Sequence, residues 1–148
     1  TNATVDAVIG AQLWRAFTSW NQNNTTLSAG SNILWQAEHL FLITRQYFEI
    51  TLNTASTVSW GINFEVGPQA NTPIASATIP ANVQTVFIQF DSAAVTTYSY
   101  QNSYGYYITV PMRPIFTYPN DYGVIDINPA PSASTITANM IVSQYLEI

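Results

Sequence analysis

Few side chains in this sequence are suited to catalysis. The single histidine, His39, follows Glu38 in an otherwise apolar stretch. A Ser-His-Asp triad needs three residues brought together in space, and no Gly-x-Ser-x-Gly motif marks a nucleophile. We therefore interpret His39 as a packed or surface histidine, and we expect the protein not to be an enzyme.

Carboxylates offer an alternative chemistry, the binding of a hard cation. Asp121 and Asp126 flank a four-residue apolar run, and Asp91 ends another apolar run. Calcium accepts such carboxylates together with loop carbonyls, but no EF-hand pattern is present. Asp121 and Asp126 are thus calcium candidates, with solvated turn aspartates as the simpler interpretation. No cofactor is expected.

Aromatic residues form the densest local cluster. Asn102, Ser103 and Gly105 lie among them and predict a hairpin turn whose tip displays tyrosines. Tyrosines with small polar neighbours suit protein contacts and stacking against sugars. The alternative is that these tyrosines pave the core of the fold and its rim. The cluster consists of Tyr98, Tyr100, Tyr104, Tyr106 and Tyr107.

Charge is unusually scarce. Three arginines, no lysine and eight acids make 7% of the 148 residues charged, against about 25% in a typical soluble domain. Neutralising phosphates requires clusters of Lys and Arg, so a nucleic-acid partner is not expected. A surface of Thr, Ser, Asn, Gln and Tyr suits a protein that is packed in an assembly, coated with sugar or exposed to extreme pH.

Several features favour export. The sequence begins at Thr1, as a mature protein does after a signal peptide is removed. Sequons occur at Asn2, Asn23 and Asn24, the last two in a polar stretch, Asn21–Ser28, that we expect to be an exposed loop able to carry glycan. The longest wholly apolar run, Leu40–Ile43, is far too short to span a membrane.

Apolar residues alternate with polar ones along most of the chain, which predicts strands. Val58, Trp60, Ile62, Phe64 and Val66 share one face of Thr57–Val66, and Gln46–Asn53 repeats the pattern with Phe48, Ile50 and Leu52 inward. We expect these two strands to form a hairpin through Asn53–Ser56. Further strands are expected at Gln84–Phe90, Val95–Tyr100, Tyr106–Val110 and Gly123–Ile127. A last strand is expected at the C-terminus, where one face is shared by Ile136, Ala138, Met140, Val142, Leu146 and Ile148. The stretch Ile33–Ile43 fits a strand or a short helix.

The eight prolines all fall between these runs, where proline is tolerated. This rhythm of short strands and turns predicts an all-β protein with a single β-sandwich or jelly-roll domain. Without cysteines, such a domain needs no disulfides, because a chain of this length buries enough surface. The predicted division is an extended N-terminal segment, 1–20, and a β-sandwich domain, 21–148.

The N-terminal segment has its own pattern. Apolar residues occupy the odd positions Val5, Ala7, Ile9, Ala11 and Leu13. Val5, Ile9 and Leu13 also fit a helical stripe, but the glycine at position 10 and the β-branched content favour a strand. The alternating part is longer than an ordinary strand, and order at a chain end requires docking.

Lack of lysine, abundance of Thr, Tyr and Asn, nearby sequons and this alternating segment together resemble the subunits of archaeal surface filaments, the threads and bundling pili. The pattern is also similar to that of bacterial biofilm-matrix fibre subunits. The resemblance covers the general pattern of the whole chain. It implies donor-strand complementation, in which the N-terminal strand of one subunit fills a groove in the next, with Val5, Ala7, Ile9, Ala11 and Leu13 as the inserted face.

The first functional hypothesis is therefore a non-catalytic subunit of an extracellular, cell-surface filament, with other copies of itself as partners. A viral capsid, spike or decoration jelly roll is the second, which would place the protein in a virion; the scarcity of basic residues counts against an RNA-packaging capsid. The third is a carbohydrate-binding, lectin-like module that recognises sugar or a cell surface.

Overall fold

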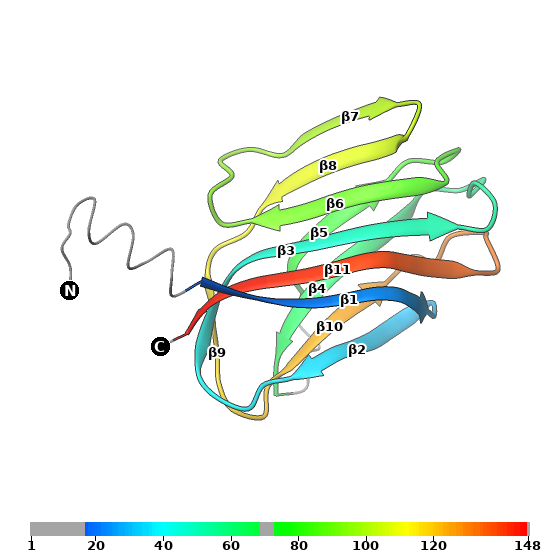
Figure 1. Ribbon diagram of the computed structural model, residues 1–148. Helices are drawn as coiled ribbons and strands as arrows, with labels where there is room; N and C mark the ends of the chain where they lie inside the picture. The colour runs from blue at the N-terminus through cyan, green and yellow to red at the C-terminus, as the bar shows by residue number, and fades with distance from the viewer. Residues whose placement is uncertain (1–16, 69–72, 148) are drawn as a thin grey trace.

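The protein is a two-layered β-structure (Figure 1). A computed structural model describes residues 17–68 and 73–147. Predictions for Val5, Ala7, Ile9, Ala11 and Leu13, and for the sequon at Asn2, lie outside these residues. The described strands are β1 (Phe17–Leu27), β2 (Gly30–Gln36), β3 (Phe41–Leu52), β4 (Trp60–Gly67), β5 (Pro73–Ile79), β6 (Thr85–Asp91), β7 (Tyr98–Asn102), β8 (Gly105–Pro111), β9 (Ile115–Thr117), β10 (Tyr122–Ile127) and β11 (Ile136–Glu147).

Two sheets pack face to face. The larger sheet has the order β1-β11-β3-β6-β8-β7, with β9 beside the start of β3, and the smaller has the order β2-β10-β4-β5. The described strand pairs are antiparallel, except that β6 and β8 run parallel. This arrangement confirms the predicted all-β sandwich.

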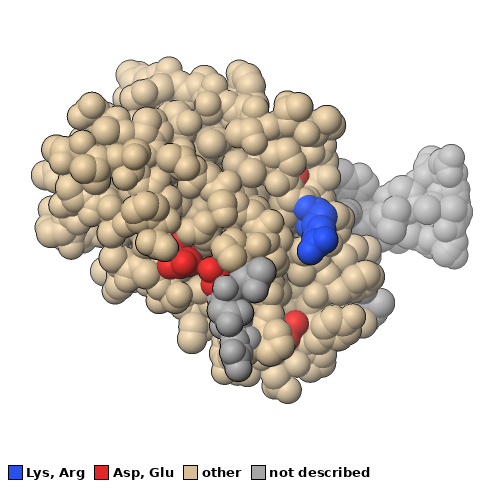
Figure 2. Space-filling model, turned by 180° about the vertical axis from the view of Figure 1, so that it is seen from behind, with Lys and Arg blue, Asp and Glu red and all other residues tan. Residues whose placement is uncertain are grey.

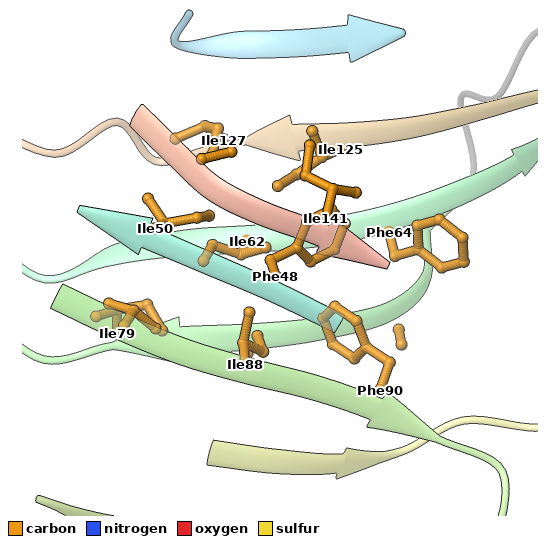
Figure 3. Packing of buried hydrophobic residues seen from close by; sticks show 14 of the residues in the cluster. Phe48, Ile50, Ile62, Phe64, Ile79, Ile88, Phe90, Ile125, Ile127 and Ile141 are labelled. Atoms are coloured by element: carbon orange, nitrogen blue, oxygen red, sulfur yellow. The ribbon is translucent and has the colours of Figure 1, made fainter. Parts of the chain in front are cut away.

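Aromatic and branched aliphatic side chains fill the space between the sheets (Figure 3). Phe48 and Phe90 from the larger sheet meet Phe64 from the smaller one, and each pair of ring centroids is 6.4 Å apart. Isoleucines surround these rings, including Ile50, Ile62, Ile79, Ile88, Ile125, Ile127 and Ile141. The inward positions expected for β3, and for β4 from Trp60 to Phe64, are confirmed.

The hairpin expected through Asn53–Ser56 is wrong. β3 and β4 belong to different sheets, so the segment between them crosses the end of the sandwich. Ser56 is buried there, and its hydroxyl donates to the carbonyl of Val58 at 2.7 Å and accepts from the backbone N–H of Ser132 at 3.1 Å. Tied down in this way, the segment leaves Val58 exposed instead of inward.

The C-terminal strand changes faces midway. The register between β11 and β3 shifts between Ala138 and Met140, which makes Asn139 a β-bulge. Because an inserted residue reverses the alternation beyond it, Ile141 is fully buried and Met140 is exposed. The single inward face expected from Ile136 is therefore wrong for Met140, Val142 and Leu146, and the expectation for Ile148 lies outside the described residues.

Three boundaries also differ from expectation. The polar stretch Asn21–Ser28 is not a loop, since most of it belongs to β1, which pairs with β11 along its length. The ambiguous stretch Ile33–Ile43 contains the end of β2 and the start of β3. The strand expected from Val95 begins only at Tyr98, and Val95 is 90% exposed. Propensity and alternation alone did not reveal these boundaries because pairing partners decide where a strand ends.

Replacing Phe64 by alanine tests the central packing. The substitution leaves a cavity between Phe48 and Phe90, and we expect it to lower the free energy of unfolding by about 3–5 kcal/mol. Urea denaturation followed by circular dichroism measures the change. Val95→Ala is the control, because this exposed side chain should contribute less than about 0.5 kcal/mol. Equal stability of the two variants would contradict the proposed core.

Candidate functional site

Part of the predicted tyrosine cluster lies on the outer face of the larger sheet. Tyr100 of β7, Tyr107 of β8 and Phe87 of β6 lie opposite one another on three neighbouring strands. The rings of Phe87 and Tyr107 stack 4.4 Å apart at 11°, and those of Tyr107 and Tyr100 stack 4.7 Å apart at 4°. These spacings match the separation of adjacent strands. We call Phe87, Tyr107 and Tyr100 the aromatic ladder.

A shallow hollow of about 200 Å³ lies beside the aromatic ladder. Tyr47 of β3 and Tyr98 of β7 stand at its two sides, and Gln89 and Thr109 occupy the strands between them. The hollow therefore has aromatic walls and a polar floor. We call it the tyrosine hollow.

Charges near the tyrosine hollow are few and paired. Burial, followed by the nearby charge of Glu49, raises the pKa of Tyr47 to about 12. The Tyr47 hydroxyl thus stays protonated at neutral pH and forms a hydrogen bond with Glu49. Two residues further along the same strands, Arg45 Nε lies 3.4 Å from Asp91 Oδ2, which also accepts a hydrogen bond from Gln89 Nε2 at 2.9 Å.

The remaining tyrosines of the cluster serve the hairpin between β7 and β8. Tyr104 is at its tip and is 75% exposed, whereas Tyr106 faces inward and packs against the core. Asn102 Oδ1 accepts hydrogen bonds from the backbone N–H groups of Tyr104 and Gly105, at 2.8 Å and 3.3 Å. The cluster is therefore divided, because Tyr106 is half-buried against the core, whereas Tyr98, Tyr100 and Tyr104 are exposed.

A second hollow, of about 310 Å³, opens where β2, β3 and β11 come together at one end of the sandwich. Trp35 meets Phe41 edge-to-face at 5.5 Å, and Phe41 packs on Tyr145 at 4.6 Å. We call this hollow the terminal groove. Its described lining consists of Trp35, Gln36, Ala37, Glu38, His39, Phe41, Ser143 and Tyr145.

Trp35 is held in the terminal groove from two directions. Gly123 lies against the indole so closely that a Cβ atom there would be 2.4 Å from the ring. The indole Nε1 donates to Ser143 Oγ at 3.2 Å, and Ser143 in turn donates to the buried Gln46 Oε1. This chain of polar contacts satisfies groups that would be costly to bury alone.

His39 lies on the exposed rim of the terminal groove. Its Nε2 is 3.2 Å from Glu147 Oε2, and its ring meets Phe41 edge-to-face at 6.0 Å. Both partners of the ion pair are about half exposed, so the contact adds little to stability. The sequence predicted a packed or surface histidine. In the structure His39 is a surface residue whose ring contacts Phe41.

The two calcium candidates do not come together. Asp121 and Asp126 are separated along the extended β10 by about 16 Å. Asp121 accepts a hydrogen bond from the backbone N–H of Tyr118 at 2.9 Å, which closes a local turn. Among residues 17–68 and 73–147, no three or more His, Cys, Asp or Glu side chains form a group that could hold a metal ion.

The sequons at Asn23 and Asn24 lie on β1, which forms an edge of the larger sheet. Both asparagines are exposed, and Asn24 has a positive φ of 55°. A glycan at this edge would project from a strand instead of from the expected loop.

Residues that the sequence did not reveal complete both hollows. Phe87, Tyr47 and Gln89 join the tyrosine hollow through strand pairing with distant segments. Trp35 and Tyr145, from different sheets, both line the terminal groove, and each contacts Phe41. Alternation identified most of these residues as strand positions, but it could not indicate which strands become neighbours.

No family model, no curated protein and no solved structure matches this chain. Within the described residues, no helix is long and apolar enough to cross a membrane.

Seen from behind the view of Figure 1, the molecule has acidic and basic groups only in small, separated areas (Figure 2). Glu65 of β4 is buried beside β10, which carries Asp126. Burial, followed by the charge of Asp126, raises the pKa of Glu65 above the usual carboxyl range. A buried carboxyl group therefore binds its proton more tightly in the folded than in the unfolded chain.

This pKa shift predicts a pH dependence of stability. Between the unfolded glutamate pKa of about 4.3 and the raised folded value, the folded state binds more protons, so stability falls as the pH rises. Glu65→Gln removes the titrating group, and we expect a smaller fall in the melting temperature from pH 4 to pH 7 than in the wild type. Thermal unfolding at both pH values measures this difference. Glu38→Gln is the matched control, and an identical response of the two variants would disprove the assignment.

Proposed function

We propose that the protein is a non-catalytic structural subunit of an extracellular filament, in which residues 1–16 of one copy dock in the terminal groove of the next. The observation that carries the proposal is the position of the terminal groove beside the start of β1. Phe17 pairs with Leu146, and the neighbouring Tyr145 lines the groove. β1 therefore begins next to a hollow with aromatic walls.

The chemistry of the segment and the groove agrees. Val5, Ile9 and Leu13 are apolar and four residues apart, so they would share one face of an extended segment. Each such side chain gains about 1.5–3 kcal/mol when it moves from water into an apolar site. The groove offers Trp35, Phe41 and Tyr145 as apolar walls. A 16-residue extended segment reaches about 50 Å, which is enough to meet a neighbouring subunit.

The scarcity of charge supports an assembled protein. A monomeric domain normally depends on mixed surface charge for solubility, whereas only 7% of these residues are charged. Contacts between uncharged polar surfaces avoid the cost of desolvating ions. The same property suits subunits of a virion, so the shape of the native assembly in electron micrographs distinguishes filaments from closed particles.

Engineered cysteines test docking between copies, since the native chain has none. One copy carries Ile9→Cys and the other carries Glu38→Cys, at the exposed rim of the terminal groove. We expect the mixture to form a disulfide-linked heterodimer under mild oxidation. With Val95→Cys in place of Glu38→Cys, the yield should fall at least about tenfold, because disulfides need close Cα atoms. A single chain that carries both Ile9→Cys and Glu38→Cys completes the test. An internal disulfide in this double variant, with no heterodimer in the mixture of single variants, would show that the segment folds back on its own chain.

A charge in the segment provides an independent check. Ile9→Asp should give a folded protein that fails to assemble, because the groove would have to bury an unpaired carboxylate. Circular dichroism reports the fold and sedimentation reports the assembly, with Ile9→Val as the conservative control. An unfolded Ile9→Asp protein would contradict docking in a neighbour.

The tyrosine hollow favours a second candidate function, recognition of a neutral sugar. Tyr47 and Tyr98 provide aromatic walls, and Gln89 and Thr109 provide hydrogen-bonding groups between them. Sugars present apolar C–H faces and rings of hydroxyl groups, which such a combination matches. The uncharged floor argues for a neutral saccharide instead of an anionic one.

Binding of neutral oligosaccharides, followed by the nuclear magnetic resonance signals of the saccharide protons, tests this candidate. Thr109→Arg fills the floor of the tyrosine hollow and should abolish binding, whereas Thr26→Arg, on exposed β1, should preserve it. If both variants broaden the proton signals of every saccharide equally, the lectin-like function is excluded.

A further inference from the structure

β7 leaves one long side of the larger sheet open. It pairs with β8 on one side and, within the part of the chain that the structure describes, with no strand on the other. All five of its residues are exposed, including Ser99 and Gln101 on the face toward the smaller sheet. Figure 1 shows β7 at the upper rim of the larger sheet. The backbone groups on its outer side are therefore available to another strand.

The open side of β7 lacks the features that normally prevent strand addition. Natural edge strands carry charges, prolines or bulges. β5 begins with Pro73, and β1 contains Asn24 in the left-handed region. The sequence of β7, Tyr-Ser-Tyr-Gln-Asn, has no charge and no proline, and its register with β8 is continuous.

The hairpin holds this edge in an extended shape. Asn102 pairs with Gly105 across a two-residue turn, and Asn102 Oδ1 accepts the two backbone hydrogen bonds of that turn. Gly105 has a φ of 155°, and a Cβ atom there would lie 2.5 Å from the carbonyl oxygen of Thr85. The turn is thus fixed against β6, and β7 is organised before any partner binds.

Tyr100 is the terminal ring of the aromatic ladder. One face stacks on Tyr107, and the side chain remains 47% exposed. Strands in a sheet are about 4.8 Å apart, which is close to the spacing of the ladder's rings. A strand added beside β7 would place its own side chain against the open side of Tyr100.

The pairing of β7 with β8 determines which backbone groups point outward. The pair that closes a two-residue hairpin is hydrogen-bonded, and bonded pairs alternate along an antiparallel ladder. Tyr98, Tyr100 and Asn102 therefore bond to β8. The N–H and C=O groups of Ser99 and Gln101 face away from the sheet.

We propose that β7 pairs antiparallel with β7 of a second copy, about a two-fold axis at Tyr100. In this register Ser99 of each copy is opposite Gln101 of the other, and their outward groups form about four main-chain hydrogen bonds. Tyr100 meets Tyr100 of the second copy as a non-bonded pair, whose side chains lie closest. The aromatic ladder then continues from one sandwich into the other.

A second copy is the partner because the strand complements itself. The outward groups are distributed symmetrically about Tyr100, the central residue of the five, and no like charges become opposed. An isologous contact of this kind closes after two subunits. It is separate from the docking of residues 1–16, so it would join two filaments side by side, or two free subunits where no filament forms.

Full-length single-cysteine variants test the pairing. A mixture of Ser99→Cys and Gln101→Cys copies should form a disulfide-linked heterodimer, because bonded antiparallel pairs have Cα atoms about 5.5 Å apart. Each variant alone, and Tyr104→Cys in place of either, should cross-link at least about tenfold more slowly. Fast cross-linking of Ser99→Cys alone would indicate another register, either antiparallel with its axis at Ser99 or parallel. Equal rates for all variants would show no specific pairing, and either result overturns the proposal.

A charge swap at the axis provides the matched control. Adding Tyr100→Asp to both cysteine variants places like charges opposite each other and should reduce cross-linking about tenfold, whereas Tyr100→Phe should preserve it. Combining a Tyr100→Asp copy with a Tyr100→Lys copy should restore the product. Failure of this rescue, with circular dichroism showing folded protein, would rule out Tyr100 as the axis. All variants keep residues 1–16 unchanged, so these results do not depend on the terminal groove.

Discussion

The contact of Phe48, Phe64 and Phe90 between the two sheets is the interaction on which the rest of the structure depends. It fixes the central strands β3, β6 and β4 relative to one another. The smaller sheet has four strands in its order, and the larger one extends further. Strand β7 therefore projects beyond the core, and both its faces reach solvent. An exposed edge is thus a direct result of joining two sheets of unequal width around a compact core.

Part of the polar interior consists of neutral groups. Gln46 and Ser143 are buried and linked to Trp35, and Ser56 ties two crossing segments together. Neutral hydrogen bonds of this kind do not titrate at ordinary pH, unlike buried carboxylate pairs. The described residues also include three buried carboxyl groups, those of Glu65, Asp91 and Asp121. Burial, followed by the charge of Asp126, raises the pKa of Glu65. The neutral hydrogen bonds of Gln46, Ser143 and Ser56 would thus remain unchanged in an acidic environment.

The strands could be predicted from the sequence because alternation directly reflects a half-buried sheet. The inward positions Phe48, Ile50, Ile62 and Phe64 followed from that pattern alone. The bulge at Asn139 could not be foreseen, because nothing local distinguishes it from its neighbours and the partner strand β3 imposes it.

Strand neighbours were the other missing information. The tyrosine cluster was visible as a local concentration, and so was its hairpin. Its stacking on Phe87 depends on β8 lying parallel to β6, a pairing between segments that are not adjacent in the chain. The terminal groove was not visible for the same reason, since Trp35 and Tyr145 belong to opposite ends of the sequence.

The position of β11 has a consequence for the order of folding. This 12-residue strand is the last in the chain, yet it lies between β1 and β3. During synthesis from the N-terminus, β1 and β3 exist long before the strand that joins them, so the larger sheet keeps an unfilled position until β11 emerges. Contacts between such distant segments slow folding. For that interval, the backbone edges of β1 and β3 can accept a strand from any chain, and keeping newly made copies apart until β11 arrives becomes a requirement for correct folding.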